Sequence, residues 1–418
     1  MPLDRQALAG IRVIDLSMGW AGPLAARYLA DMGADVIKVE SCERFDWWRS
    51  WEATPEWIAD DGAEKSTAFN MVNRNKKNVT LDLENPRGRD LLLQLVKTAN
   101  LVVENYSGGV LPKLNLGYEV LREVNPGIIL LSMPPFGANG PWGDFRAYGS
   151  TVEQSAGLPH LNGAEDDPPA MHHVAYGDAM GGLTGASALL VALRHQARTG
   201  EGQFVDLSQV EGLFPLAIHG ILEQAALGRP PARTGNRRSD MAPHGVYPCQ
   251  GHDSWIVIQI ETEAQWLALS QTSGLSFGDL SDRLARVDEL EQALATWTAG
   301  YDAKALMYDL QHRGIPAAAT YRASELLAHD QLAARQHWQW LERASVGNQP
   351  NPSSPFRSLG QAPAALDAGP IPIDLPAPTL GQHNEEVLRG LLGLGAEEIR
   401  ALEAQGIIGK KPRMPSKT

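Results

Sequence analysis

The sequence contains little cysteine and no long apolar run. Cys42 and Cys249 are the only cysteines among 418 residues, and their spacing is not that of a disulfide framework or a metal site. We therefore expect a reduced, cytoplasmic protein. No run of about 18 apolar residues marks a membrane span, and we find no signal peptide ahead of the first strand-like segment. The hydrophobic fraction of 43% and the charged fraction of 20% are those of a soluble globular protein.

Positive charge is also scarce. The net charge is −13, which argues against nucleic acid as the main partner because phosphate backbones need a basic footprint. An anionic small molecule is not excluded, since local basic groups decide its binding. The segment 73–78 is one such group and contains Arg74, Lys76 and Lys77. It is either a site for an anion or a solvated turn before a strand.

The hydrophobic pattern alternates between short apolar runs and helical spacing. Pro23 suits the first turn of a helix and Gly33 its end. This alternation predicts a doubly wound, Rossmann-like α/β domain with right-handed crossovers. The loop 17–22 lacks G-x-G-x-x-G, so a dinucleotide site is not supported. The strand-like runs are 12–16, 34–40, 79–83, 101–105, 128–133 and 204–207.

Composition changes near residue 226, where Gly, Pro and Arg cluster. Residues 1–225 are expected to form the first part of a large α/β domain, and 226–335 a smaller α+β domain. Residues 336–418 include a Pro-rich stretch, 345–380, and end in two helical segments. We expect them to extend over the surface and to complete the large domain.

One carboxylate lies among glycines ahead of a helical run. Residues 176–182 read Tyr-Gly-Asp-Ala-Met-Gly-Gly and lead into an Ala/Leu-rich stretch. Asp178 can cap that helix, and a cap favours its ionised form. An ionised carboxylate in an open, glycine-lined niche is also a plausible nucleophile toward an acyl group. The segment alone is compatible with both roles.

Tryptophan is concentrated in the irregular segment 41–72, which contains Trp47, Trp48, Trp51 and Trp57. Tryptophan is costly to expose, and loops carry function more often than core elements do. The segment is therefore either a hydrophobic plug or subunit contact, or else the aromatic wall of a substrate pocket, around a cation for example.

Several motifs occur in a fixed order along nearly the whole chain. Each alone is weak, but with this order and spacing the chain resembles the class III CoA-transferases, the group of formyl-CoA transferase and carnitine CoA-transferase. The resemblance implies an enzyme that moves CoA from an acyl-CoA thioester to a free carboxylic acid. The motifs are 8–16 (LAGIRVIDL), 21–23 (AGP), 33–40 (GADVIKVE), 75–77 (NKK), 104–106 (ENY), 125–126 (NP), 177–178 (GD), 199–203 (TGEGQ) and 314–316 (GIP).

The same resemblance implies an open, ring-shaped chain that interlocks with a second ring in a dimer. The dimer is expected to be a homodimer, although some relatives pair two different subunits. CoA is expected to lie along the large domain. The implied CoA contacts are Arg74, Lys76, Lys77, Asn105 and Lys113, and the implied acyl pocket contains Trp20, Arg146 and Tyr148.

The resemblance also implies a mechanism in which Asp178 is the nucleophile. Its carboxylate attacks the thioester to give a mixed anhydride and a CoA thiolate, which returns to form an aspartyl-CoA thioester. An incoming carboxylate then reverses the sequence. One carboxylate suffices, without ATP and without a metal. Neighbouring glycine N–H groups are candidates for stabilising the oxyanion.

Other activities remain open at this point. A racemase of the same family needs an acid/base pair, with a His near position 149, where this chain has Gly149. His172 and His173 are possible substitutes, although His at such positions is more often structural. Binding of CoA esters without turnover is a second alternative, and a transferase/lyase variant acting on an onium or aromatic acid is a third.

Two departures from the formyl-CoA transferase branch concern the substrate. Trp20 stands where that branch has a Gln near the acyl group, and its glycine-rich lid has no evident counterpart in the region 235–245. Both differences favour an acid larger than oxalate or formate.

Overall fold

The computed structural model describes residues 6–171, 174–357 and 369–414. The chain divides into two compact units. The large unit contains the residues up to Ala156, Met171–Ala217 and the residues from Asp330 onward, while the small unit contains Gly157–Ala170 and Ile218–His329. The domain limits expected from the sequence, after residues 225 and 335, stay predictions.

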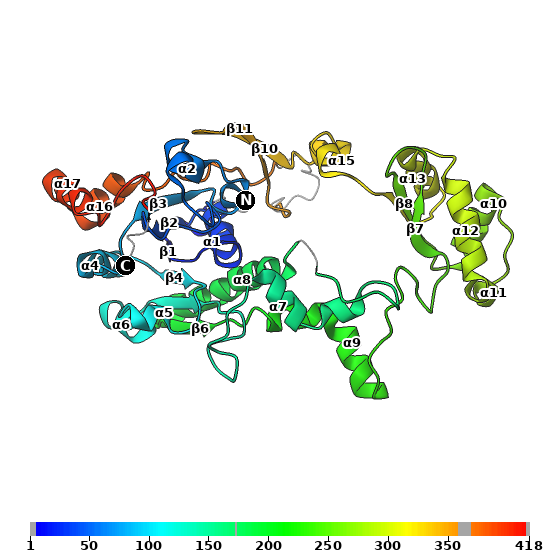
Figure 1. Ribbon diagram of the computed structural model, residues 1–418, viewed down its shortest axis with the longest axis horizontal. Coiled ribbons are helices and arrows are strands. Elements are labelled where there is room, and N and C mark those ends of the chain that lie inside the picture. The colour runs from blue at the N-terminus through cyan, green and yellow to red at the C-terminus, as the bar shows by residue number, and fades with distance from the viewer. Residues whose placement is uncertain (1–5, 172–173, 358–368, 415–418) are drawn as a thin grey trace. The chain divides into compact units, whose positions relative to one another are not determined.

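A six-stranded parallel sheet forms the centre of the large unit (Figure 1). Its order is β3-β2-β1-β4-β5-β6, which is the strand order of the Rossmann fold and reverses direction between β1 and β4. The carboxyl ends of those two strands therefore border a natural ligand crevice. The sheet confirms the expected α/β class. Its strands are β1 (Arg12–Asp15), β2 (Asp35–Glu40), β3 (Lys76–Thr80), β4 (Leu101–Glu104), β5 (Ile129–Ser132) and β6 (Gln203–Asp206).

Helix α4 of the large unit follows the start signal that the sequence predicts. Asn85 caps α4 by accepting a hydrogen bond from the Arg87 N–H, and Pro86 occupies the first turn. Helix α9 crosses the boundary between the two units. The helices are α1 (Ala21–Asp31), α2 (Pro55–Ala59), α3 (Thr67–Val72), α4 (Pro86–Val96), α5 (Val110–Lys113), α6 (Tyr118–Val124), α7 (Gly149–Ser155), α8 (Tyr176–Thr199), α9 (Phe214–Leu227), α15 (Asp330–Ala334), α16 (Asn384–Leu392) and α17 (Ala396–Ala404), with 3-10 turns η1 (Gly62–Glu64) and η3 (Glu211–Leu213).

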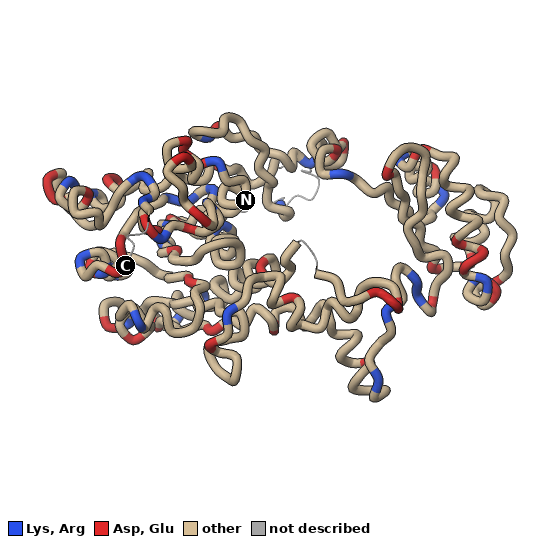
Figure 2. Tube along the Cα trace, in the orientation of Figure 1, with Lys and Arg blue, Asp and Glu red and all other residues tan. Residues whose placement is uncertain are grey.

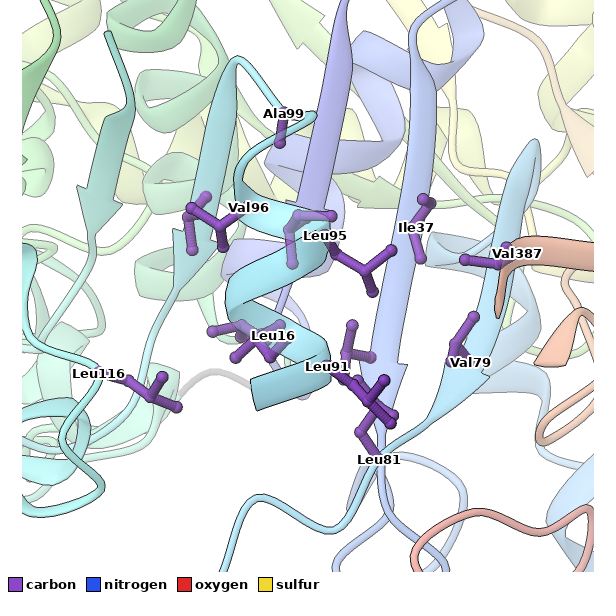
Figure 3. Close-up of a cluster of buried hydrophobic side chains, with 14 of the residues drawn as sticks. Leu16, Ile37, Val79, Leu81, Leu91, Leu95, Val96, Ala99, Leu116 and Val387 are labelled. Atoms are coloured by element: carbon purple, nitrogen blue, oxygen red, sulfur yellow. The ribbon is translucent and has the colours of Figure 1, made fainter. Parts of the chain in front are cut away.

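Successive strand residues enter two different apolar cores, one on each face of the sheet. Val13 packs with α1 and α8, whereas Ile14 packs with α4, α6, α16 and α17. Figure 3 shows the second core, with Leu91 and Leu95 of α4 beside Ile37 of β2. Because α16 and α17 belong to this core, the last described residues complete the large unit.

The small unit contains a three-stranded antiparallel sheet with helices around it. A further two-stranded hairpin, β10 (Trp338–Arg343) with β11 (Gly347–Pro352), lies in the large unit, where the Pro-rich composition predicted only extended chain. The elements of the small unit are η2 (Leu158–Leu161), β7 (His244–Pro248), β8 (Trp255–Gln259), α10 (Glu263–Ser273), α11 (Leu280–Ala285), α12 (Val287–Thr298), α13 (Ala303–His312), β9 (Ala317–Ala319) and α14 (Ala323–Leu326).

Charged residues of both signs are interspersed along the described chain (Figure 2). Among the described residues, no helix combines the length and the apolar character that are needed to cross a bilayer. In the same residues, no group of three or more His, Cys, Asp or Glu side chains is arranged to hold a metal ion.

Candidate active site

Asp178 lies in the first turn of α8, with its side chain half-buried. The helix begins at Tyr176, and Ala175 occupies the cap position with a left-handed backbone, φ 52°. No side chain caps this end of the helix. Of the two roles open from the sequence, the N-cap is therefore not observed, and the Asp178 carboxylate is turned toward other elements.

Two backbone N–H groups from other helices reach the Asp178 carboxylate. They belong to Ala21, the first residue of α1, and Gly149, the first residue of α7. Burial raises the pKa of Asp178 to about 6, and these two hydrogen bonds oppose the rise. The carboxylate is thus mainly ionised at neutral pH, while part of its hydration is replaced by fixed amide groups.

Glycine at two positions allows α7 and α8 to approach closely. A Cβ atom at Gly149 would lie 2.1 Å from Asp178 Oδ2, and one at Gly177 would lie 2.7 Å from the Gly149 carbonyl oxygen. A His at position 149 would therefore overlap the carboxylate in this arrangement. His172 and His173, the possible substitutes, lie outside the described residues.

An aromatic residue precedes the first amide donor. Trp20 stands directly before Ala21, and its ring packs against Trp48 with 5.5 Å between the ring centroids. The irregular tryptophan segment is thereby brought to the start of α1.

A second aromatic residue precedes the other donor. Tyr148 stands before Gly149 and meets Trp47 and Trp51 edge-on, at centroid distances of 5.7 and 5.4 Å. Trp47 and Trp51 stack on each other at 4.5 Å. Trp51 and Tyr148 stay 66% and 57% exposed, so this surface is open to a ligand. We call Trp20, Trp47, Trp48, Trp51 and Tyr148 the aromatic wall.

The remaining residue of the implied acyl pocket is Arg146, which is exposed two positions before Tyr148. Trp57 is not part of the aromatic wall, because it stacks on Phe45 at 5.5 Å. The structure thus brings Trp20, Tyr148 and Asp178 to the same site. Arg146 is close to Tyr148 in the sequence and is exposed at the surface.

Two of the expected phosphate contacts are buried. The Arg74 guanidinium pairs with Asp31 at 2.7 Å. The Lys76 ammonium pairs with Asp15 at 2.8 Å and donates to the Pro23 carbonyl oxygen and to Asn73. Burial lowers the pKa of Lys76 to about 8. Neither cation can reach a phosphate without breaking these contacts, so the geometry does not support the role that we expected for them.

The other expected CoA contacts are more accessible or act on the backbone. Lys77 is partly exposed and pairs with Asp35 at 3.2 Å and Glu386 at 3.1 Å. Asn105 accepts a hydrogen bond from the Met18 N–H and donates one to the Met18 carbonyl oxygen, at 2.8 and 2.7 Å. Asn105 therefore fixes the loop between β1 and α1.

A cavity of about 410 Å³ lies beside the carboxyl ends of the strands in the large unit. Its lining includes Lys113, one of the CoA contacts that the resemblance implies, and Arg44, which the sequence analysis did not single out. Arg44 follows β2 at the carboxyl edge of the sheet, where ligands of such sheets bind. Its position just after a predicted strand is the sequence feature that could have identified it as a candidate CoA contact. The lining residues are Met18, Val39, Glu40, Ser41, Arg44, Phe45, Trp47, Leu81, Asp82, Leu83, Glu84, Tyr106, Val110, Lys113 and Leu114.

A larger cavity, of about 930 Å³, lies in the small unit between residues 232–239, β7 and α12. None of the residues predicted to bind or react lines it. Size alone therefore does not identify the site in this chain.

Glu104 is a second carboxyl group with a displaced pKa. It accepts hydrogen bonds from the Ser132 hydroxyl and, at 2.8 Å, from the Tyr106 N–H. Burial at the end of β4 nevertheless raises its pKa to about 7.

Comparisons with known proteins show the family to which the chain belongs. Residues 8–384 match the family described as CoA-transferase family III. The chain is 33% identical to succinyl-CoA–D-citramalate CoA-transferase of Chloroflexus aurantiacus over 97% of this chain and 98% of that one. It is 32% identical to succinate–glutarate CoA-transferase of Agrobacterium fabrum over 94% and 97%.

A solved structure of a CAIB/BAIF family protein from Brucella suis has the same fold. Its TM-score is 0.80 at 29% identity, covering 92% of this chain and 99% of that chain. The chain therefore belongs to CoA-transferase family III and is an enzyme that transfers CoA between an acyl-CoA and a carboxylic acid.

Proposed function

We propose that Asp178 is the nucleophile of this CoA transfer and carries CoA as an aspartyl thioester. The observation on which the proposal rests is the half-buried Asp178 carboxylate, which lies against Gly149 and whose pKa the backbone N–H groups of Ala21 and Gly149 lower. A pKa of about 6 keeps it ionised at neutral pH, and partial desolvation favours attack on an acyl carbon.

The reaction then proceeds by exchange of acyl bonds alone. An Asp178 oxygen attacks the thioester carbonyl, the C–S bond breaks, and a mixed anhydride and a CoA thiolate result. The thiolate attacks the Asp178 carbonyl carbon, and the donor acid leaves with the bridging oxygen. The acceptor carboxylate attacks the aspartyl-CoA thioester, and the released thiolate takes the acceptor acyl group from the second anhydride. Asp178 is regenerated, and no proton is gained or lost.

In this mechanism the N–H groups of Ala21 and Gly149 also stabilise a developing oxyanion. When the thiolate or the acceptor attacks the Asp178 carbonyl carbon, negative charge develops on the remaining Asp178 oxygen. The N–H groups of Ala21 and Gly149 are already hydrogen-bonded to this carboxyl group. Preorganised amides of this kind stabilise such an oxyanion without reorientation at the moment of reaction.

The aromatic wall supports an acyl group larger than formyl or oxalyl. Its exposed members, Trp51 and Tyr148, offer flat apolar surface next to Gly149. Succinyl-CoA is the donor named for the relative from Chloroflexus aurantiacus, and exposed Arg146 suits the distal carboxylate of such a donor. An aromatic acceptor acid would stack on the same wall.

CoA is proposed to lie along the carboxyl edge of the sheet, in the cavity that contains Lys113 and Arg44. Met18 and Trp47 also line this cavity. Trp47 also belongs to the aromatic wall, where it contacts Tyr148. One residue therefore connects this cavity to the aromatic surface beside Asp178.

We also propose that the chain forms a ring and acts as an interlocked homodimer. Large apolar side chains are exposed on two helices, and exposed apolar surface of this extent is typical of an interface. They are Leu183, Leu190 and Val191 on α8 and Phe214, Leu216, Ile218, Ile221, Leu222 and Leu227 on α9. Light scattering on Leu222→Asp is expected to give a smaller species than Leu267→Asp, a matched change on α10, where Leu267 is equally exposed.

Trapping of the intermediate tests the proposal. The protein is incubated with succinyl-CoA, glutaryl-CoA and benzoyl-CoA in turn, quenched with hydroxylamine and digested. A hydroxamate on Asp178, absent in Asp178→Asn, is expected with at least one donor. Exchange of an α-proton with solvent deuterium, without a hydroxamate, would favour the racemase instead.

A further inference from the structure

Asp46 connects two segments beneath the aromatic wall. One carboxylate oxygen accepts hydrogen bonds from the N–H groups of Gly19, at 2.8 Å, and Trp48, at 2.9 Å. The other lies 2.9 Å from the Lys38 ammonium. Lys38 in turn donates to the Ser17 carbonyl oxygen at 2.7 Å. The Asp46 and Lys38 side chains are both fully buried, so water does not compete for these contacts.

The contacts of Asp46 fix the loop 17–20 from both sides. Gly19 has a left-handed backbone, φ 73°, and a Cβ atom there would lie 2.2 Å from the Trp47 ring. The ring of Trp48 packs on Trp20. The loop ends at Ala21, whose backbone N–H group acts on the Asp178 carboxylate and lowers its pKa. A change at Asp46 is therefore transmitted to that amide through two residues of backbone.

The net stability of the ion pair between Lys38 and Asp46 does not explain why these two residues are present. Burial lowers the pKa of Lys38, but the carboxylates of Asp46, Asp15 and Glu40 outweigh it, and its pKa stays above the usual value. Buried ion pairs generally contribute no more net stability than apolar residues of similar size. What an apolar pair cannot supply is an acceptor for the two amides.

We propose that Asp46 is a positioning residue for the CoA transfer, holding the loop 17–20 so that the Ala21 N–H faces the Asp178 carboxylate. The inference rests on the proposed role of Asp178 as the nucleophile. It assigns to Asp46 no contact with either substrate.

Loss of the Ala21 hydrogen bond has a specific signature, because that bond lowers the pKa of Asp178. Without it, the pKa rises above about 6, and the acidic limb of the pH–rate profile moves to higher pH. Charged neighbours do not account for this pKa: none of the ionisable residues on the elements packed against α8 contributes to it. These residues are Arg27, Tyr28 and Asp31 on α1, Glu153 on α7, Asp206 on β6 and Glu211 on η3.

The test compares Asp46→Ala with the unaltered protein. We expect kcat to fall about 100-fold, KM for the acyl-CoA to change less than about threefold, and the acidic limb to shift upward. The variant Asp46→Asn keeps an oxygen acceptor for the two amides and leaves the Lys38 contact with the Ser17 carbonyl oxygen in place. We expect it to retain the unaltered pH limb, and this comparison stays informative if Asp46→Ala does not fold.

Asp31→Ala is the matched control. It removes the acidic member of another fully buried pair in the same unit, Arg74 with Asp31 at 2.7 Å, at the end of α1 away from the loop 17–20. Any general destabilisation is shared by both alanine variants, but the shift of the pH limb is expected only in Asp46→Ala.

An unshifted limb and unchanged kcat in a folded Asp46→Ala would overturn the inference, and so would an equal shift in Asp31→Ala. A shifted limb in Asp46→Asn would do the same. Hydroxamate formation on Asp178 is measured first in the unaltered protein. Its absence would reject the nucleophile, whereas its presence with unshifted Asp46 variants would reject only the positioning role.

Discussion

The Asp178 carboxylate occupies the space where a side chain at position 149 would begin. A Cβ atom on Gly149 would lie 2.1 Å from Asp178 Oδ2, and the Gly149 N–H donates a hydrogen bond to the same carboxylate. One glycine thus supplies both the donor and the room that the proposed nucleophile needs.

Gly149→Ala is expected to lower kcat about 100-fold, because the added methyl group displaces the carboxylate from its two amide donors by an ångström or more. Steady-state rates and thermal unfolding are measured together. Gly390→Ala on α16 is the matched control, since its Cβ atom would meet nothing within 4 Å. A Gly149→Ala enzyme with kcat within threefold of the unaltered protein would contradict the proposed geometry.

Glu104 predicts a dependence of stability on pH. Its folded-state pKa is raised to about 7 from 4.5 by burial, so the ionised form is the one that folding disfavours. The contribution of this group to the free energy of unfolding is full below about pH 4.5 and is lost as the pH rises through about 7. The loss amounts to about 3 kcal/mol, at 1.36 kcal/mol for each pKa unit.

Glu104→Gln is neutral at every pH and keeps a carbonyl oxygen for the Tyr106 N–H. We expect urea unfolding between pH 5 and pH 8 to show a smaller decline in this variant than in the unaltered protein. An identical decline in both would contradict the assignment of the pH dependence to Glu104.

Much of the fold was predictable, because its signals are local. The strand runs, the Asn85–Pro86 helix start and the position of Asp178 before an Ala/Leu-rich helix are readable within a few residues. The roles of Arg74 and Lys76 were not, since their acidic partners lie 43 and 61 residues away in the chain. A run of basic residues on a turn looks solvated until the tertiary fold pairs it.

The amide donors to Asp178 could not be predicted from the sequence either. Ala21 and Gly149 have no polar side chain, and their N–H groups become donors only because α1 and α7 begin at the same place. Backbone groups carry no residue-type signal, so a site built from them emerges only from the packing of helices.

Substitution of Lys113 is expected to change the KM for the acyl-CoA, whereas substitution of Arg74 is expected to change the stability of the protein. Lys113→Ala removes a cation from the cavity proposed for CoA, so KM for the acyl-CoA should rise about tenfold, or about 1.4 kcal/mol, with kcat unchanged. Lys97→Ala, at an exposed position on the C-terminal end of α4, serves as the control in the same steady-state assay. An unchanged KM in Lys113→Ala would place CoA elsewhere.

Arg74→Met removes the cation nearest to buried Asp31, which keeps only the Asn75 amide and the more distant Arg27, at 3.7 Å. We expect the free energy of unfolding to fall by about 3 to 5 kcal/mol, measured by urea titration, with little change of KM in the protein that remains folded. A raised KM without loss of stability would restore Arg74 as a phosphate contact.

The most direct test of the account follows oxygen atoms through a single turnover. Succinyl-CoA is mixed with the protein and an excess of succinate labelled with oxygen-18 in both carboxylates, and the peptide that contains Asp178 is then weighed by mass spectrometry. Attack by the acceptor on an aspartyl-CoA thioester leaves one acceptor oxygen on Asp178, so the account predicts oxygen-18 in that peptide. CoA exchange into labelled succinate with an unlabelled Asp178 would contradict the account.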